Sequence, residues 1–388
     1  TNSKTGFSTS GLGDIDGDEI SDFISGAPGN TEAGVDRAPG PEEAGAAIVF
    51  LGSTDEEERA TPDIVFLGEA AHDRAGVAVA GDFDFNGDTI NDFMIGAEQV
   101  DRTDPDNPVL VGAGKAYLIY FDPTDTTHYP NINDPTTTDY VSLSLVGQPG
   151  GIPGVVFVGE ALGDQAGFAL AGGGLVDPGM GHDIAIGAPG HDTSGGQDAG
   201  AVYAIFDDPT LTGTVNLADV PDTVDGVVYE GHAAGDALGF SVAFPGDVVV
   251  PDGEDIIMGA PLADVDTGAD VIHPDAGTAY LGSAGTLQKG IIEVGEIGTE
   301  QDGAQVRGDQ PGEQLGYSVA GGGDNLVNGE PDTLIGAPYY DKDTGEGDAS
   351  LESAGRVAQL GGRLEKGIIE VGEIGTETDY AVAGASYI

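Results

Sequence analysis

The chain has 388 residues, of which 68 are Asp or Glu and only 12 are Lys or Arg, so its formal net charge is -56. A charge of this sign and size excludes nucleic acid and anionic membrane surfaces as partners, because both would repel it. The chain contains no cysteine, which excludes disulfides, thiolate metal sites and cysteine nucleophiles.

The charge also indicates the environment in which the protein folds. Repulsion among so many carboxylates would destabilise a compact state in dilute buffer. At about 1 M salt the Debye length falls to roughly 3 Å, which screens most of this repulsion. Because 39% of the residues are apolar and occur in regular short runs, we expect a folded protein adapted to brine. The longest apolar runs, such as 155–158 and 248–250, are far too short to span a membrane.

A seven-residue block recurs five times along the chain. Each copy begins with Asp and carries Gly-Ala at its fifth and sixth positions, and all but the second end in Pro. The copies lie at 22–28, 92–98, 183–189, 255–261 and 332–338. Their glycines, at 26, 96, 187, 259 and 336, are 70, 91, 72 and 77 residues apart. Such self-similarity is the signature of a repeat architecture with loops of variable length.

Three further strand-like segments accompany each block. A Gly-led segment of alternating large and small residues precedes it, a run of β-forming residues follows it, and a fourth short run leads to the next copy. The Gly-led segments are 6–8, 76–81, 167–172, 239–243 and 316–321. The third segments are 46–51, 115–121, 201–206, 278–281 and 356–360, and the fourth include 64–67, 155–158 and 227–229.

Four short strands per unit, joined by Gly, Pro and Asp turns, are typical of a propeller blade. We therefore predict an all-β fold, a β-propeller of five four-stranded blades that spans 1–388 as a single domain. The blades are expected at about 1–70, 71–160, 161–232, 233–309 and 310–388. A β-helix would need much shorter coils and a sandwich does not require five copies, so the propeller is preferred to both.

Two segments depart from the basic unit. Residues 122–140 are rich in Thr, Pro and Asn and are expected to form a surface excursion of the second blade without a binding role. An identical sequence occurs at 289–300 and 366–377, where it marks equivalent strands of the fourth and fifth blades. The tail 380–388 would then match the segment near Val306, an outer strand.

An acidic loop precedes the repeated block in the first blade. It reads DIDGDEISD from 14 to 22, with carboxylates at positions one, three, five and nine. Alternating oxygens on a tight loop converge on one point, and Ca²⁺ takes about 6 to 8 oxygen ligands in a flexible shell. The predicted Ca²⁺ ligands are Asp14, Asp16, Asp18, Asp22 and the main-chain carbonyl of Ile20 at position seven. Mg²⁺ fits less well because it demands a tight octahedron and keeps its waters.

The second blade repeats this loop as DFNGDTIND from 84 to 92. The predicted ligands are Asp84, Asn86, Asp88, Asp92 and the carbonyl of Ile90, with Asn86 offering a neutral oxygen at position three. Acids could form such a loop by chance in so acidic a chain. Two matching frames at the same place in two blades argue against chance.

The other three loops have lost some of these oxygens. The fifth keeps Asp324, Asn328 and Asp332 and is predicted to be a weaker site. The third keeps Asp183, with Leu175 at position one, and the fourth has apolar residues or Pro at positions three and five. We expect metal-free turns in the third and fourth blades.

The Gly-Phe segment, the Asp-x-Asp-x-Asp-x-x-x-Asp loop and the Gly-Ala-Pro block together resemble the FG-GAP repeat of the integrin α-subunit β-propeller. The resemblance covers nearly the whole chain. It implies a propeller with Ca²⁺ sites on the blade rims, an extracellular or cell-surface location, and a role in adhesion or ligand binding. With the acidic composition, it implies a surface protein of the haloarchaeal type. The chain departs from the better-known members in blade number, since those members carry seven blades. A similar fold also does not show which ligand this chain would bind.

We therefore expect a calcium-stabilised binding or adhesion propeller on a halophile surface, whose partner is a protein or glycan. A structural subunit of an extracellular filament or surface layer, whose partners are copies of itself, is the second hypothesis. A polysaccharide-active enzyme is the third. A non-enzymatic role is preferred because the six histidines lack metal-ligand spacing and no Gly-x-Ser-x-Gly or Gly-Lys-Ser/Thr motif occurs. Paired acids for glycoside hydrolysis stay open, since their pairing depends on geometry.

Overall fold

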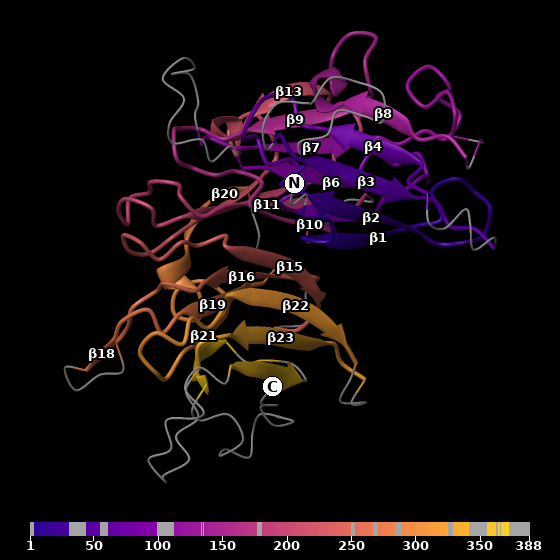
Figure 1. Cartoon of the computed structure of the whole chain (residues 1–388). Helices are drawn as coiled ribbons and strands as arrows, with labels where there is room; N and C mark the ends of the chain where they lie inside the picture. The colour runs from indigo at the N-terminus through magenta and orange to yellow at the C-terminus, as the bar shows by residue number, and fades with distance from the viewer. Residues whose placement is uncertain are drawn as a thin grey trace. The chain divides into compact units, whose positions relative to one another are not determined.

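The computed structural model describes residues 4–30, 44–54, 61–98, 112–132, 134, 136–176, 181–249, 253–266, 271–283, 289–324, 329–340, 355–361, 364 and 366–371. The predicted all-β class is confirmed: the strands form five sheets of three to five strands and one two-stranded hairpin (Figure 1). Short 3-10 turns occur at η2 (Leu143–Leu145), η3 (Leu217–Asp219) and η5 (Val294–Glu296). No helix in the described part of the chain has the length and apolar character needed to cross a membrane.

Each repeat builds one antiparallel sheet whose strands follow in chain order. The first repeat contributes β1 (Thr9–Gly13), β2 (Asp22–Ala27), β3 (Ala46–Phe50) and β4 (Ile64–Leu67), and the second β5 (Val79–Phe83), β6 (Asp92–Ala97), β7 (Lys115–Ile119) and β9 (Gly154–Val158). The third contributes β10 (Ala169–Gly174), β11 (Asp183–Ala188), β12 (Ala201–Ile205) and β14 (Gly226–Glu230). The fourth contributes β15 (Ser241–Gly246), β16 (Asp255–Ala260), β19 (Thr278–Gly282) and β21 (Gly303–Arg307), with the hairpin β17 (Val265–Asp266) and β18 (Ile272–His273) between β16 and β19. The fifth contributes β22 (Ser318–Gly323), β23 (Asp332–Ala337) and β24 (Arg356–Gly361).

These sheets match the strand segments expected from the sequence. The repeated block forms the second strand of every sheet, and the Gly-led segment forms or immediately precedes the first. Where the register of the first two strands is recorded, it shifts just before the acidic loop, for example between Gly11 and Gly13 in β1. A bulge at this point bends the first strand and turns the chain into the loop. The tail 380–388 lies outside the described residues.

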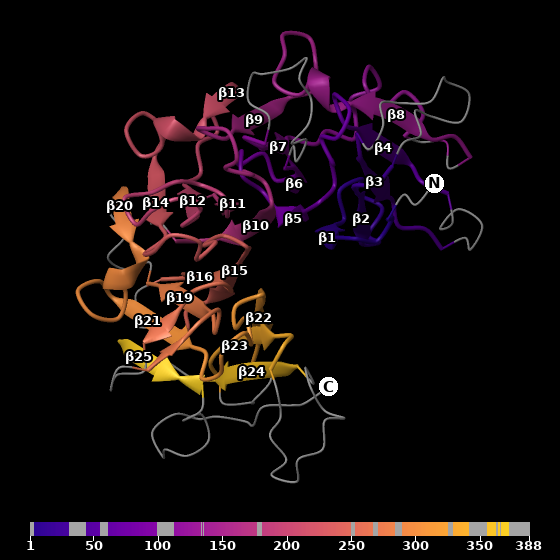
Figure 2. The same ribbon diagram turned by 60° about the vertical axis from the view of Figure 1, so that its left-hand side comes forward.

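A strand from the following repeat extends each of the first four sheets. These donated strands are β8 (Asp139–Ser142), β13 (Gly213–Asn216), β20 (Gly290–Glu293) and β25 (Gly367–Glu370). They pair in parallel with β4, β9, β14 and β21, respectively (Figure 2). The excursion 122–140 therefore ends in a strand that joins the first sheet, and the identical segments 289–300 and 366–377 begin with equivalent strands, as predicted.

The last two donated strands are fixed by equivalent ion pairs. Lys289 Nζ lies 2.9 Å from Asp225 Oδ1, and Lys366 Nζ lies 3.1 Å from Asp302 Oδ1. Each lysine directly precedes its donated strand, and each aspartate directly precedes the strand with which that donated strand pairs. Both pairs are partly exposed, so each contributes little to stability and mainly favours the register.

The chain divides into two compact units. The first comprises Thr1–Gly173, Gly179–Ile186 and Phe206–Val220, and the second Gly174–Pro178, Gly187–Ile205 and Pro221–Ile388. In the first unit Phe66 of β4 and Phe93 of β6 belong to one buried cluster, with ring centroids 5.6 Å apart. In the second unit Leu281 of β19 and Ile335 of β23 share another buried cluster. Each core is thus formed between the sheets of consecutive repeats.

Close approach of the backbone explains the glycine of the repeated block. A Cβ on Gly96 would lie 2.0 Å from the carbonyl oxygen of Gly167 in the following repeat. A Cβ on Gly26 would lie equally close, at 2.0 Å, to the carbonyl oxygen of Gly76. No side chain fits in this space, so glycine in the second strand lets the Gly-led segment of the next repeat pack against it.

We expect Gly96→Ala to destabilise the protein by about 1–3 kcal/mol, because the added methyl group forces the backbone of the next repeat to move. Gly11→Ala is the matched control, since a Cβ on Gly11 meets no atom within 4 Å. Urea unfolding at constant high salt measures both free energies. Equal values for the two variants would contradict the packing role of Gly96.

Candidate metal centre

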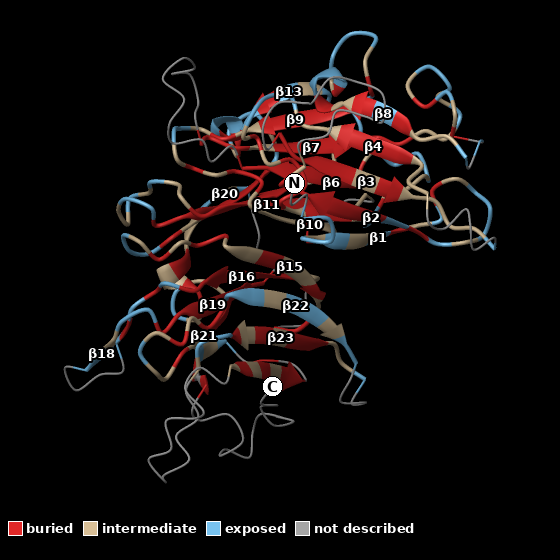
Figure 3. Ribbon diagram, in the orientation of Figure 1, coloured by how far each residue is buried: buried red, intermediate tan, exposed pale blue. Residues whose placement is uncertain are grey.

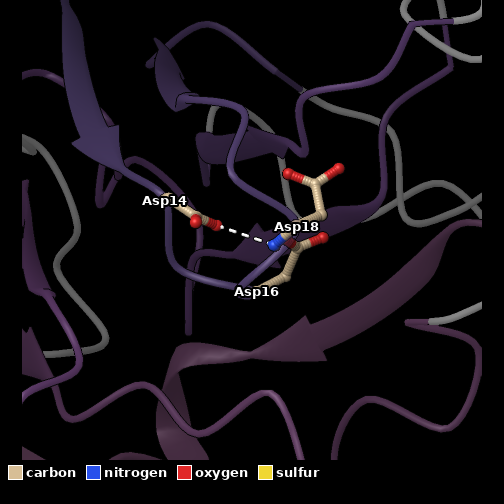
Figure 4. A group of neighbouring side chains, drawn as sticks. All are labelled: Asp14, Asp16 and Asp18. Carbon is tan, nitrogen blue, oxygen red and sulfur yellow. Dashed lines mark hydrogen bonds between the residues drawn. The ribbon is translucent and has the colours of Figure 1, made fainter.

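Three carboxylates converge in the loop between β1 and β2. One oxygen from each of Asp14, Asp16 and Asp18 lies within 4.8 Å of the others (Figure 4). Asp14 and Asp18 are exposed and Asp16 is half-buried. Carboxylate oxygens in such a group could hold a metal ion.

Asp14, at position one, shapes this loop by accepting backbone hydrogen bonds. Its Oδ1 accepts the N–H groups of Gly17 (2.8 Å) and Asp18 (3.0 Å), and its Oδ2 accepts that of Glu19 (2.8 Å). Gly17 and Glu19 adopt positive φ angles of 85° and 71°. Glycine takes this conformation readily, whereas Glu19 is held in it by its bond to Asp14. The result is a tight turn that brings alternate carboxylates together.

The loop between β5 and β6 repeats this geometry. Asp84 Oδ1 accepts from Gly87 (2.7 Å) and Asp88 (3.2 Å), and its Oδ2 accepts from Thr89 (2.8 Å). Gly87 and Thr89 have φ angles of 77° and 76°. Asn86 Nδ2 donates to Asp88 Oδ2 at 3.0 Å, so the neutral amide replaces one carboxylate repulsion with a hydrogen bond.

Position seven is tied to position five in both loops. The N–H of Ile20 donates to Asp18 Oδ1, and that of Ile90 donates to Asp88 Oδ1, each at 2.8 Å. These bonds place the two isoleucine backbones beside the carboxylates of their own loops. Their carbonyl groups stay the predicted main-chain ligands.

The aspartate at position nine is buried beneath each loop. Asp22 is 2% exposed and accepts the N–H of Ile15 at 2.7 Å and that of Gly52, after β3, at 2.6 Å. Asp92 is 0% exposed, and its Oδ2 accepts the N–H of Phe85 at 2.9 Å. Among the described residues, Asp92 Oδ1 is buried and lacks a hydrogen-bond partner.

Among the described residues, three acids with oxygens within 4.8 Å of one another occur at Asp14, Asp16 and Asp18, and neither Asp22 nor Asp92 belongs to such a group. A buried carboxylate oxygen without a partner costs free energy, and a metal ion would remove that cost. Burial, with a smaller contribution from the other carboxylates of each loop, raises the pKa of Asp22 to about 6 and that of Asp92 to about 7. A bound divalent cation would act in the opposite direction and favour the ionised form.

The fifth loop retains part of this arrangement. The N–H of Gly329 donates to Asp324 Oδ2 at 2.9 Å, which corresponds to the bond from Glu19 to Asp14 in the first loop. Asp332, at position nine, is 0% exposed. Asn328, the third residue predicted for this weaker site, lies outside the described residues.

The third and fourth loops keep the buried aspartate although other acids are replaced. Asp183 Oδ1 accepts the N–H of Asp207 at 3.0 Å, as Asp22 accepts that of Gly52. Asp255 Oδ2 accepts the N–H groups of Val248 at 2.6 Å and Val249 at 2.7 Å. In the fourth repeat position nine therefore fixes the loop although the remaining ligand positions are not all acidic.

Two residues outside the predicted ligand sets connect consecutive repeats at the loops. Asn91 Nδ2 donates to the carbonyl of Leu12 (3.0 Å) and to Asp82 Oδ1 (2.8 Å). His182 Nδ1 accepts the backbone N–H of Asp84 at 3.0 Å. Both residues occupy position eight, directly before a buried aspartate, and this shared position is the sequence signal of their role.

No protein-family model and no curated protein matches this sequence. The resemblance to FG-GAP repeats therefore depends on the sequence motifs alone.

We expect the cation-free protein to lose stability as the pH rises from about 4 towards 7. In the folded state the pKa of Asp22 is raised to about 6 and that of Asp92 to about 7, from a model-peptide value of 3.8. The folded protein therefore holds protons that the unfolded chain has released. This stabilisation is complete below about pH 4 and is lost as the pH rises through the folded-state pKa values.

Urea unfolding with a chelator at constant high salt, at about pH 4.5 and pH 7.5, measures this change. Asp92→Asn keeps the size of the side chain but cannot ionise, so this variant should show a smaller loss of stability. An equal loss in both proteins would rule out Asp92 as its source.

Proposed function

We propose that the loops 14–22 and 84–92 bind Ca²⁺, and that the protein is a calcium-stabilised extracellular binding module built from FG-GAP repeats. The observation that carries this proposal is the group formed by Asp14, Asp16 and Asp18, whose oxygens lie within 4.8 Å of one another in a loop whose hydrogen bonds the Asp84 loop repeats. Two loops of different sequence thus adopt one hydrogen-bonding geometry.

The donor set favours Ca²⁺ over other cations. All the side-chain ligands are oxygens, from Asp14, Asp16, Asp18 and Asp22 in the first loop. Hard oxygen ligands suit Ca²⁺ and Mg²⁺, and a loop that offers several carboxylates and a carbonyl supplies most of the calcium shell. The ion would also offset the repulsion between like charges held a few ångströms apart.

The five sheets would be the blades of a β-propeller. The regular strand order, the donated strands and the glycine contact between consecutive repeats support this arrangement, because each repeat packs against its neighbour in the same way. Loops between first and second strands recur at the same end of every blade. Calcium would therefore stabilise one rim of the propeller.

A cell-surface role in brine agrees with the composition. The net charge of -56 requires screening by salt, and weak calcium sites are common in extracellular modules. The partner would be a protein or a glycan on the surface. Tyr317 and Tyr339, 41% and 49% exposed with ring centroids 6.4 Å apart, are aromatic groups suited to contact it.

Chelation of Ca²⁺ at constant high salt and neutral pH should lower the melting temperature by roughly 5 °C, because the ion stabilises only the folded loops. A double variant, Asp16→Ala with Asn86→Ala, should lose most of the difference in melting temperature between the protein with and without Ca²⁺. Asp134→Ala removes an exposed carboxylate outside the loops and should keep the full calcium effect. Calorimetry measures all three proteins, and a wild-type melting curve that chelation leaves unchanged would refute the proposal.

A further inference from the structure

The four donated strands lie at the ends of their sheets, so each presents a strand edge. Among the described residues, each of them pairs with one other strand only. In β6 and β16, the second strands of their sheets, every residue is buried (red in Figure 3), whereas β20 contains no buried residue. A strand edge offers backbone groups to a further strand. Closure of the sheets into a propeller would keep these outermost strands on the circumference, so their edges stay accessible.

The edge strand of the third sheet carries an ordered pattern of charge. Lys289, directly before β20, shares one face of the strand with Ile291 and Glu293, because side chains alternate between faces. Ile291 is 61% exposed, and the side chains of Lys289 and Glu293 are 52% and 38% exposed. Asp225 holds the lysine beside the strand, and His232 contacts the glutamate. This face therefore presents a cation, an apolar group and an anion in that order.

The same three residue types recur at the edge of the fourth sheet. Lys366, Ile368 and Glu370 occupy the equivalent positions of β25, and Ile368 is 41% exposed. The donated strands of the first two sheets have uncharged residues at these positions, which are Thr138, Tyr140 and Ser142 for β8 and Thr212, Thr214 and Asn216 for β13. The charge pattern thus occurs at two of the four edges, in a chain that has only 12 Lys and Arg residues.

We infer that β20 and β25 bind the same strands of a second copy of this chain, by antiparallel pairing of edge with edge. The pattern is complementary to itself. In an antiparallel pair centred on Ile291, this residue faces its equivalent, and Lys289 of each copy faces Glu293 of the other. Opposite charges and apolar residues at directly opposed positions stabilise an antiparallel pair. Parallel pairing in register would set lysine against lysine and glutamate against glutamate, so the charges select the antiparallel arrangement.

Salt decides whether two such acidic chains can approach. The charge of -56 on each copy opposes association in dilute buffer. At about 1 M salt the Debye length of roughly 3 Å screens this long-range repulsion, whereas charges in direct contact across a strand pair still attract. A copy joined through β20 also presents β25 to a third copy, so the association can continue. The inference goes beyond the proposed function and does not depend on calcium.

Cross-linking tests this pairing directly because the chain has no cysteine. Ile291→Cys places two thiols opposite each other across the strand pair, and Thr214→Cys is the matched control at the same, exposed position of β13. Each variant is treated with a short bis-maleimide in molar salt. Ile291→Cys should give at least about tenfold more two-chain product than the control, because pairing raises the effective concentration of the thiols. Ile291→Cys combined with Ile368→Cys should also give products of three or more chains.

Charge exchange tests the register. Glu293→Lys in the Ile291→Cys chain should lower the yield of two-chain product about tenfold, because lysines then face each other at both ends of the pair. Mixing this chain with an Ile291→Cys chain that carries Lys289→Glu should restore the yield, since each lysine again faces a glutamate. Melting curves confirm that the variants fold. The inference is overturned if Ile291→Cys cross-links no better than Thr214→Cys, if Glu293→Lys leaves the yield unchanged, or if the mixture does not recover it.

Discussion

The buried aspartate that begins the second strand of every repeat is the group on which the loops and the metal centre depend. It is at most 2% exposed in all five sheets. Its oxygens accept backbone N–H groups from the loop in the first, second and fourth repeats, and from the residues after the third strand in the first and third repeats. A buried carboxylate is tolerable only with such partners, so this residue fixes the loop to the sheet. The proposed cation sites require, in addition, oxygen ligands at positions one, three and five.

Contacts between repeats turn a local motif into a continuous structure. The glycine of the second strand admits the backbone of the next repeat, and a donated strand extends the preceding sheet in parallel. Position-eight side chains such as Asn91 and His182 add hydrogen bonds near the loops. A loop that binds a cation is thus coupled to the neighbouring repeat as well as to its own sheet. The stability of each repeat therefore depends partly on its contacts with the neighbouring repeats, as in other repeat proteins.

The strands were predictable because their signals are local and recur five times, and the convergence of the loop carboxylates was predictable because the acidic frame recurs in two repeats. The block beginning at Asp22 or Asp92 gives a strand, and the spacing of Asp14, Asp16 and Asp18 gives converging carboxylates. The donated strands β8 and β13 were not predictable, because their parallel pairing with the preceding repeat has no local signal. Only β20 and β25, which lie in identical sequences, could be matched with each other. The burial of position nine was not predictable either, because the spacing of the four acids of a loop gives no signal that distinguishes a buried one from the others.

The most direct measurement is the number of Ca²⁺ ions bound per chain, by equilibrium dialysis in molar monovalent salt at neutral pH. The loop geometry predicts one ion for each of the loops 14–22 and 84–92. Asp16→Ala should abolish binding at the first loop only, and Asn86→Ala should weaken the second only, because each residue belongs to a separate site. No bound Ca²⁺, or a number that neither substitution changes, would contradict the assignment of these loops as the cation sites.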